Sequence, residues 1–266
     1  MVTTDTANVY SERYVAFIDI LGFSSHVRQS EHSPSEAEKL VKIMNRISSH
    51  WSDKALLVTH DIYGEDFRSQ SFSDCTILSE AATPRGLHYL LFRVTSFAVD
   101  LLANGFLSRG GIAKGPLHHS DSAVFGPAFL RAYDLEQHVA DYPRIIVDQN
   151  THQDFNFPSP VTWDKNVQPD LRHADDGPVY VDIFSWFKFP GQSPYERIEM
   201  LRKECRDNIQ VKLDASIYVP AHYKKLQWLM TVWNRTVERE SGRNQWIVAP
   251  AQRDFEKRNE VKSIQA

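Results

Sequence analysis

The chain has little cysteine and no excess of positive charge, and each shortage excludes a class of protein. Only two of its 266 residues are cysteines, Cys75 and Cys205, and residues so far apart lack the ligand spacing of a zinc ribbon. The formal net charge is −4, whereas a general nucleic-acid coat needs a basic face. We therefore expect reduced thiols, a cytoplasmic location and no nucleic-acid partner.

Long hydrophobic runs are also missing. No apolar stretch approaches the roughly 20 residues of a membrane-spanning helix. The first residues, MVTTDTANVYSER, have neither the basic flank nor the apolar centre of a signal peptide. With 42% hydrophobic and 24% charged residues, the composition is that of a soluble globular protein with a substantial core. We expect no membrane partner.

Glycine is scarce and unevenly placed. There are 11 glycines, and eight of them lie between Gly22 and Gly126. Glycine is the residue that allows tight turns and close approach of the backbone to a ligand. Positions with such backbone demands are therefore expected in the first half of the chain.

Apolar periodicity and turn residues predict an α+β fold. Hairpins alternate with helices, which favours a mainly antiparallel sheet with helices packed on it. We divide the chain into a core, residues 1–150, and an extension, residues 151–266, packed on it within the same domain; residues 148–177 are expected to form a long connection. The predicted strands are 14–21, 56–63, 69–78, 106–117, 123–125, 144–147 and 178–184, and the predicted helices are 35–51, 84–104, 126–139, 194–214 and 221–240.

Asp19 interrupts the first predicted strand, between Phe17-Ile18 and Ile20-Leu21. A buried carboxylate is costly unless it is paired, hydrogen-bonded or bound to a metal. Gly22-Phe23-Ser24 follows, and a sharp turn there would place backbone N–H groups beside the carboxylate, a combination that suits a phosphate–metal complex. The alternative is a buried aspartate that caps its own turn.

Asp74 is a second carboxylate between apolar residues, in Ser71-Phe72-Ser73-Asp74-Cys75-Thr76-Ile77-Leu78. We expect it on a strand. Adjacent strands lie about 4.8 Å apart, so Asp19 and Asp74 could share one or two hard cations. Mg²⁺ or Mn²⁺ held by two carboxylates and substrate phosphates is a common arrangement in nucleotide chemistry.

A third segment, Ser108–Leu117, reads SRGGIAKGPL. Its glycines would let a strand pass close to a ligand or to a neighbouring backbone. Arg109 and Lys114 supply positive charge, and the arginine fork suits phosphate. The alternative is an ordinary bulged strand with solvated basic residues.

Together these segments resemble the catalytic domain of the class III nucleotidyl cyclases, over roughly residues 13–148. The family's aromatic-x-Asp-Ile-x-Gly-Phe-Ser/Thr motif matches residues 17–24, and its second metal aspartate matches Asp74. Its Arg-x-Gly-Ile-x-x-Gly-Pro strand matches residues 109–116. Its Phe-Gly turn into a helix with an Ala…Leu-Glu signature matches residues 125–136. The resemblance implies a ferredoxin-like antiparallel sheet.

The resemblance also implies a site. Two divalent cations, Mn²⁺ or Mg²⁺, would be held by Asp19, Asp74 and the Ile20 carbonyl. Class III sites form between two catalytic domains, so a homodimer with two shared sites is implied. The residues implied to contact the nucleotide are Phe17, Ile20, Gly22, Phe23, Gln70 and Arg109.

Departures from the family pattern bear on the substrate. Gln70 and Ala123 fall where purine cyclases place base-reading residues, and neither the adenine nor the guanine pair is present. Leu130 and Asp134 fall where those enzymes place the Asn and Arg that stabilise the transition state, and Arg131 is a candidate substitute. ATP and GTP are therefore disfavoured.

Residues 14–23, 176–182 and 222–234 are similar to the pyrimidine cyclases of bacterial Pycsar anti-phage defence. That resemblance implies an enzyme that converts UTP, or alternatively CTP, to the cyclic monophosphate and pyrophosphate, and a separate effector that responds to the product. Gln70 could face the base, but its amide both donates and accepts hydrogen bonds. Gln70 therefore does not distinguish uracil from cytosine.

Two rival functions remain. The first is a catalytically inactive nucleotide sensor of the same fold, favoured by the missing Asn and Arg. The second is a metal-dependent hydrolase built on His60-Asp61, His118-His119 or His173-Ala174-Asp175, none of which has a recognised ligand spacing. We expect surface histidines instead, and we expect the aromatic residues Tyr223, Trp228 and Trp233 to pack in the core or at a dimer interface.

Overall fold

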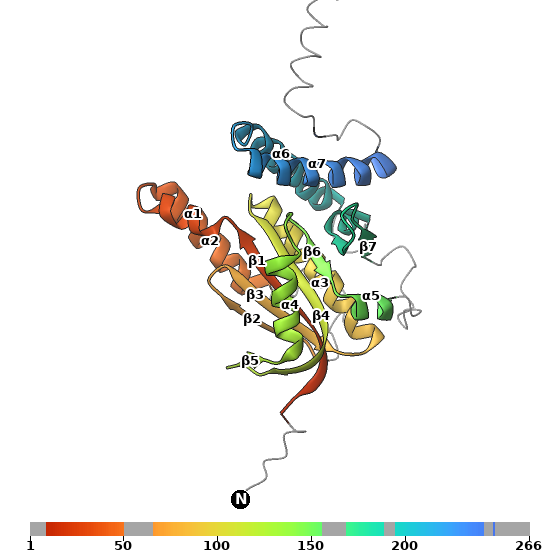
Figure 1. Cartoon of the computed structure of the whole chain (residues 1–266). Helices are drawn as coiled ribbons and strands as arrows, with labels where there is room; N and C mark the ends of the chain where they lie inside the picture. The colour runs from red at the N-terminus through yellow and green to blue at the C-terminus, as the bar shows by residue number, and fades with distance from the viewer. Residues whose placement is uncertain (1–8, 51–65, 156–168, 189–194, 242–246, 248–266) are drawn as a thin grey trace, which may run out of the picture.

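The computed structural model of the chain describes residues 9–50, 66–155, 169–188, 195–241 and 247. They form an α+β fold with one open sheet in the strand order β2-β3-β1-β4-β6-β8-β7, to which β5 adds by pairing with β4 (Figure 1). Neighbouring strands are antiparallel except for β4 and β6, which are parallel. The strand predicted at 56–63, which contains His60-Asp61, lies outside the described residues.

The bounds of the elements are as follows. The strands are β1 (Ser11–Leu21), β2 (Arg68–Phe72), β3 (Cys75–Ala81), β4 (Leu107–His119), β5 (Val124–Phe125), β6 (Ile145–Val147), β7 (Asp170–His173) and β8 (Val179–Asp182). The helices are α1 (Phe23–Ser30), α2 (Pro34–His50), α3 (Pro84–Ala103), α4 (Pro127–His138), α5 (Gln149–Phe155), the 3₁₀ helix η4 (Ile183–Lys188), α6 (Tyr195–Ala215) and α7 (Pro220–Ser241).

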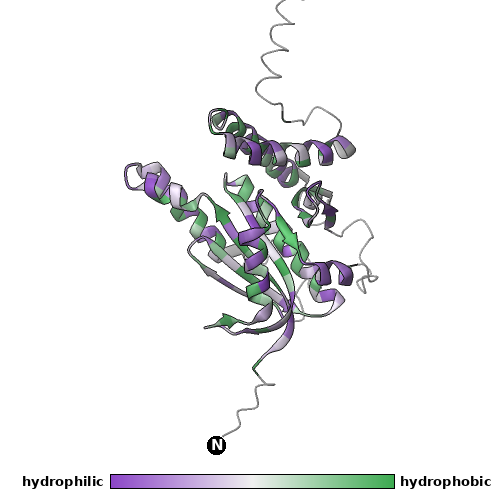
Figure 2. Cartoon of the chain, viewed as in Figure 1, coloured by the Kyte–Doolittle hydropathy of each residue, from purple (hydrophilic) through white to green (hydrophobic). Residues whose placement is uncertain are grey.

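Strand β1 lies at the centre of the sheet, between β3 and β4. Its even-numbered apolar residues, from Tyr14 to Ile20, pack in one core with α2 and α3. Val15 and Phe17 pack in a separate core with α4. Because successive side chains on a strand point to opposite faces, Asp19 belongs to the α4 face. Figure 2 shows the apolar strands at the sheet centre, against largely hydrophilic α1 and α5.

Helix α3 begins and ends as predicted. The Thr83 side chain accepts a hydrogen bond from the Gly86 N–H, Pro84 follows in the first turn, and Gly105 ends the helix with φ 83°. Within the described part of the chain, α3 is the one helix long and apolar enough to cross a membrane, and 94% of its apolar window is buried inside the protein. That burial is what a core helix requires.

Helix α4 packs directly on β4 through glycine. A side chain at Gly111 would collide with the Ala132 carbonyl oxygen and lie 2.7 Å from Leu135 Cβ. Ala128 lies one turn before Ala132 on α4, and it faces Gly115 of β4. The small residues on both elements therefore let the helix axis lie close to the sheet, and this sets the position of every α4 side chain.

The second half of the chain continues the same sheet. Strands β8 and β7 extend it beyond β6, while α6 and α7 pack with α3 around a further apolar core that includes Val99, Cys205 and Trp233. The predicted connection at 148–177 is wrong in part, because it contains α5 and β7. Their short, polar sequences carry no periodic apolar signal.

Two other predictions need correction. Helix α1 was not predicted, because its eight residues contain no buried side chain. The single strand predicted at 69–78 is two strands, β2 and β3, joined by a tight turn at Ser73 and Asp74. Ser73 adopts φ 53° there, a left-handed conformation typical of two-residue hairpin turns.

His119 gives the fold a pH dependence. Its Nδ1 lies 2.8 Å from the Ser79 hydroxyl, its side chain is buried, and burial together with Arg13 and Arg68 lowers its pKa to about 4. An unfolded histidine has a pKa near 6.5, so the unfolded chain binds the proton first. The stability due to neutral His119 is present above pH 6.5 and is lost as the pH falls towards 4.

We therefore expect His119→Gln to flatten the pH profile of stability. Between pH 7 and pH 5 the wild type should lose about 1–2 kcal/mol more free energy of unfolding than the variant. Urea unfolding at both pH values measures the difference. His32→Gln, at an exposed position, is the control. The prediction is contradicted if wild type and His119→Gln lose the same free energy of unfolding between pH 7 and pH 5.

Candidate functional site

The structure brings Asp19 and Asp74 to the same end of the sheet. Asp19 lies near the end of β1, opposite Cys75 of β3 and Arg109 of β4. Asp74 directly precedes Cys75, and its carbonyl oxygen accepts a hydrogen bond of 3.1 Å from the Ile20 N–H. The expectation that Asp74 lies on a strand is wrong. It lies in the β2–β3 turn, because a polar Ser-Asp pair suits a tight turn better than a strand interior.

Negative charge accumulates around Asp19. Burial, the strongest cause, and the nearby carboxylates of Glu136 and Asp74 together raise the pKa of Asp19 to about 6, although Arg109 opposes the shift. Repulsion among carboxylates in a half-buried position is the condition that a bound cation relieves. The site is therefore electrostatically suited to a positive ligand.

Arg109 lies between two carboxylates. Its Nε is 2.5 Å from Oε1 of Glu136 and 3.6 Å from Oδ2 of Asp19. Glu136 is fully buried on α4, and the side-chain amide of Gln137 donates to its other oxygen. The guanidinium is thus held inside the α4 face of the sheet, where it ties the helix to the strand that bears it.

Glu136 was not among the predicted site residues, although it had been noted as part of the helix signature. The signal that could have identified it is its place in the sequence. Glu136 directly follows Leu135, on the face of α4 where Ala128 and Ala132 are also buried. A charged residue on such a face needs a partner of opposite charge, and Arg109 is the strand residue that supplies it.

Gly22 makes the turn that follows β1. Its φ of 76° places it in the left-handed region as the N-cap of α1, and its carbonyl oxygen accepts hydrogen bonds from the N–H groups of Ser25 and His26. The first N–H groups of a helix lack partners within the helix. Helix α1 begins four residues after Asp19, so a phosphate and a cation would both find favourable groups here.

The other predicted nucleotide contacts differ in how far their side chains are buried. The side chains of Phe17 and Ile20 are buried, and the Phe17 ring packs edge-on against Phe129 and Tyr133 of α4. Phe17 therefore anchors the helix, and Ile20 presents only its backbone. Phe23 is partly buried against the core shared with α2 and α3.

Gln70 lies on the same sheet face as Phe17, two strands away, because both residues pair with Ile77. Its Oε1 is buried and, among the described residues, has no hydrogen-bond partner. An unpaired buried acceptor is unfavourable. This oxygen is therefore available to a donor group on a ligand.

The residues fit a divalent cation of the Mg²⁺ type. Two carboxylates and a backbone carbonyl are all oxygen donors, and such ions take their remaining ligands from water and substrate phosphates. No group of three or more His, Cys, Asp or Glu side chains that could hold a metal by itself occurs within the described ranges. An ion here would take its remaining ligands from water or from a bound phosphate group.

The positions that depart from the cyclase pattern lie on the outer face of α4 and in the hairpin next to it. Leu130 and Asp134 are exposed, Ala123 is half-buried in the β4–β5 turn, and Arg131 pairs with Asp148, Nε to Oδ1 at 2.8 Å. Arg131 is thus already engaged at the end of β6.

The histidines and aromatic residues have other roles. His118 stacks on Phe125, while His173 contacts the ring of His152 edge-on. Trp233 is fully buried in the C-terminal core, and Trp228 stacks on Tyr142. The expectation of core packing is confirmed for Trp233.

The chain matches no protein-family model and no curated protein.

Proposed function

We propose that the chain is a cytoplasmic pyrimidine nucleotide cyclase of the class III type, similar to the Pycsar enzymes, that converts UTP to 3′,5′-cyclic UMP and pyrophosphate. CTP is the alternative substrate. The observation that carries the proposal is the meeting of Asp19, Asp74 and the Gly22 turn at one end of a mainly antiparallel sheet. A separate effector would respond to the cyclic product.

The roles of the residues follow from their positions. Asp19, Asp74 and the Ile20 carbonyl would hold two divalent cations, Mn²⁺ or Mg²⁺, which would acidify the ribose 3′-hydroxyl and offset charge on the leaving pyrophosphate. The 3′-oxygen bonds to the α-phosphorus as the bond to the β-phosphate oxygen breaks, and the hydroxyl proton is released to solvent. The Gly22–Phe23 turn would bind phosphate through its N–H groups.

Arg109 and Gln70 would complete the site. Arg109 balances the charge of Asp19 and Glu136, and its guanidinium would offset triphosphate charge once cations neutralise Asp19. The unpaired Oε1 of Gln70 would accept a hydrogen bond from the base.

The assay that tests the activity is direct. Pure protein is incubated with ATP, GTP, CTP and UTP separately in the presence of manganese, and the products are identified by mass spectrometry. Cyclic UMP as the main product is the expected result. The proposal fails if a folded, pure sample forms no cyclic product from any of the four.

A nucleotide sensor of the same fold is the second candidate, favoured by the exposed Leu130 and Asp134 at the positions of the usual transition-state residues. Calorimetry with UTP and calcium, alongside the manganese assay, separates the two. A protein that binds UTP in calcium but forms no cyclic product in manganese is a sensor.

A homodimer would complete two such sites. Large apolar side chains are exposed around the α4 face: Phe72 is 79% exposed and Leu130 60%. Both belong to elements that flank the aspartates, the β2–β3 hairpin and α4. Large apolar side chains that are exposed beside the proposed site are therefore candidates for the dimer interface.

We expect Leu130→Glu to convert a dimer into a monomer. A charge at the centre of an apolar interface would be desolvated without a partner, which costs several kcal/mol of association free energy. Sedimentation velocity measures the change. Val211→Glu, at an equally exposed apolar position on α6, is the matched control, and a dimer that survives Leu130→Glu would place the interface elsewhere.

A further inference from the structure

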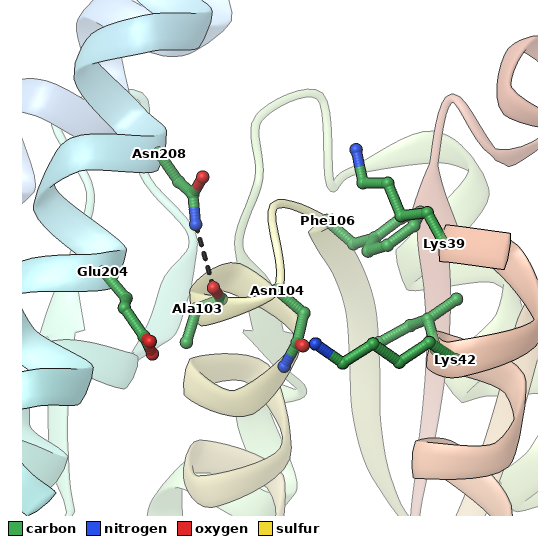
Figure 3. A pocket seen from close by; sticks show the side chains of 8 residues that line it. Lys39, Lys42, Ala103, Asn104, Phe106, Glu204 and Asn208 are labelled. Carbon is green, nitrogen blue, oxygen red and sulfur yellow. Dashed lines mark hydrogen bonds between the residues drawn. The ribbon is translucent and has the colours of Figure 1, made fainter. Parts of the chain in front are cut away.

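A hollow lies away from the aspartates, between α2, the end of α3 and α6 (Figure 3). Its volume is about 320 Å³, at the lower end of the range for small-molecule sites. The ring of Phe106, at its floor, packs in the core of the sheet face opposite to Asp19. The hollow is thus separate from the proposed catalytic site. Its lining side chains are Lys39, Lys42, Ile43, Ala103, Asn104, Phe106, Glu204 and Asn208.

Positive charge gathers on one wall. Lys39 and Lys42 are three residues apart and lie on the same face of α2. The Lys39 ammonium lies 5.3 Å from the centre of the Phe106 ring and 3.9 Å from a carboxylate oxygen of Glu36. Lys212, one turn beyond Asn208 on α6, has its pKa lowered by burial and by the nearby Lys39, against the pull of Glu36. At Lys212 the repulsion from Lys39 exceeds the attraction from Glu36, so a further anion near these lysines would be stabilised.

These lysines are not needed to cap α3. The Asn208 amide already donates to the carbonyl oxygens of Leu102 and Ala103, at 3.0 and 2.9 Å, and the Asn104 side chain donates to Asp100. The N–H groups of Gly105 and Phe106 bond to the Leu102 and Leu101 carbonyls. The last carbonyls of the helix are therefore satisfied without Lys39 or Lys42, and the Glu36 carboxylate at 3.9 Å is the anionic group that contacts Lys39.

The opposite wall has the opposite charge. Figure 3 shows Glu204 across the hollow from the lysines, with Asn104 and Ala103 between them. A carboxylate there accepts hydroxyl or amino donors and repels a second anionic group. The two walls together select a molecule that is anionic at one end and rich in donors at the other.

We propose that this hollow binds a small phosphate monoester that carries hydroxyl groups. A phosphate offers three acceptor oxygens and up to two negative charges, which suits several ammonium groups better than a single carboxylate. Its hydroxyl groups would reach Glu204 and Asn104. The site joins α2 of the core to α6 of the extension, so its occupant would stabilise the contact between them.

The test is isothermal titration calorimetry with glycerol 3-phosphate and with inorganic phosphate, at constant ionic strength in chloride. We expect saturable millimolar or tighter binding of glycerol 3-phosphate to wild type. Lys39→Gln/Lys42→Gln should raise its dissociation constant about tenfold or more. The control Lys203→Gln/Lys224→Gln, which removes two exposed charges from α6 and α7, should leave it unchanged. Glu204→Gln should weaken the binding of glycerol 3-phosphate but not the binding of inorganic phosphate.

The proposed cyclase site is tested separately by Arg109→Gln. If glycerol 3-phosphate still binds Arg109→Gln but no longer binds Lys39→Gln/Lys42→Gln, the result supports a binding site in the hollow, whether or not the protein has cyclase activity. The proposal is overturned if neither compound binds wild type, if the lysine pair and its control weaken binding equally, or if Arg109→Gln alone removes it. Circular dichroism of each variant verifies that it is folded.

Discussion

Asp74→Asn should abolish cyclic nucleotide formation and leave the protein folded. Asp74 is half-buried in a turn, where asparagine is well tolerated. The change keeps the shape of the side chain but removes one of two carboxylates that would hold the cations. Loss of this charge stabilisation is worth several kcal/mol in the transition state, so we expect a fall in kcat/KM of about a thousandfold or more.

Asp19→Asn should give the same loss with a different effect on stability. Its raised pKa of about 6 shows that the charged form is disfavoured in the folded protein. The destabilisation develops as the pH rises from about 4 to 6 and is complete above pH 6. Allowing for solvent screening of a half-buried group, Asp19→Asn should raise the free energy of unfolding at pH 7.5 by about 1 kcal/mol.

Asp121→Asn is the matched control, because Asp121 is an exposed aspartate in the other hairpin turn, between β4 and β5. Manganese provides a second measurement, independent of turnover. It should raise the Tm of wild type and of Asp121→Asn but not that of Asp19→Asn or Asp74→Asn. Full activity in Asp74→Asn would remove this residue from the metal site even if the cyclase activity is real.

Gly111→Ala should be the most damaging single-methyl change in the sheet. The added Cβ would overlap the Ala132 backbone carbonyl and crowd Leu135. A backbone atom cannot rotate away, so α4 must shift from β4. We expect a loss of about 3 kcal/mol in the free energy of unfolding, measured by urea denaturation. Catalysis should fall as well, because α4 carries the Glu136 that holds Arg109.

Gly177→Ala separates the collision from the loss of a glycine. Gly177 has φ 109°, but an added Cβ there meets no atom within 4 Å. Its cost should be only the backbone strain, about 1 kcal/mol. Equal losses in the two variants would show that the close packing of α4 on β4 is not what Gly111 provides.

Much of the fold could be predicted because its signals are local. Pro84 and Asn104-Gly105 mark the ends of α3, and Gly126-Pro127 marks the start of α4. Periodicity fails where an element buries little. Helix α1 is therefore not visible in the sequence, and β7 reads as part of a loop.

The sequence predicts that Asp19 and Asp74 lie close together on adjacent strands. The structure brings both to the same end of the sheet but places Asp74 in the β2–β3 turn. A run such as SFSDCTIL looks like one strand, because the turn inside it depends on the pairing of Phe72 with Cys75. The role of Glu136 was missed for a related reason. Its ion pair with Arg109 connects residues 27 positions apart, and only the packing of α4 on β4 brings them together.

The position of β1 between β3 and β4 has a consequence for biosynthesis. Asp19 has its neighbour on one side at Cys75 and on the other at Arg109. At typical translation rates, roughly 5–20 s separate the synthesis of β1 from that of β4. During that interval one edge of an apolar strand is unpaired on the ribosome, a state prone to aggregation. A nascent chain that ends before β4 lacks Arg109, so the proposed site cannot form until β4 has been synthesised and has paired with β1.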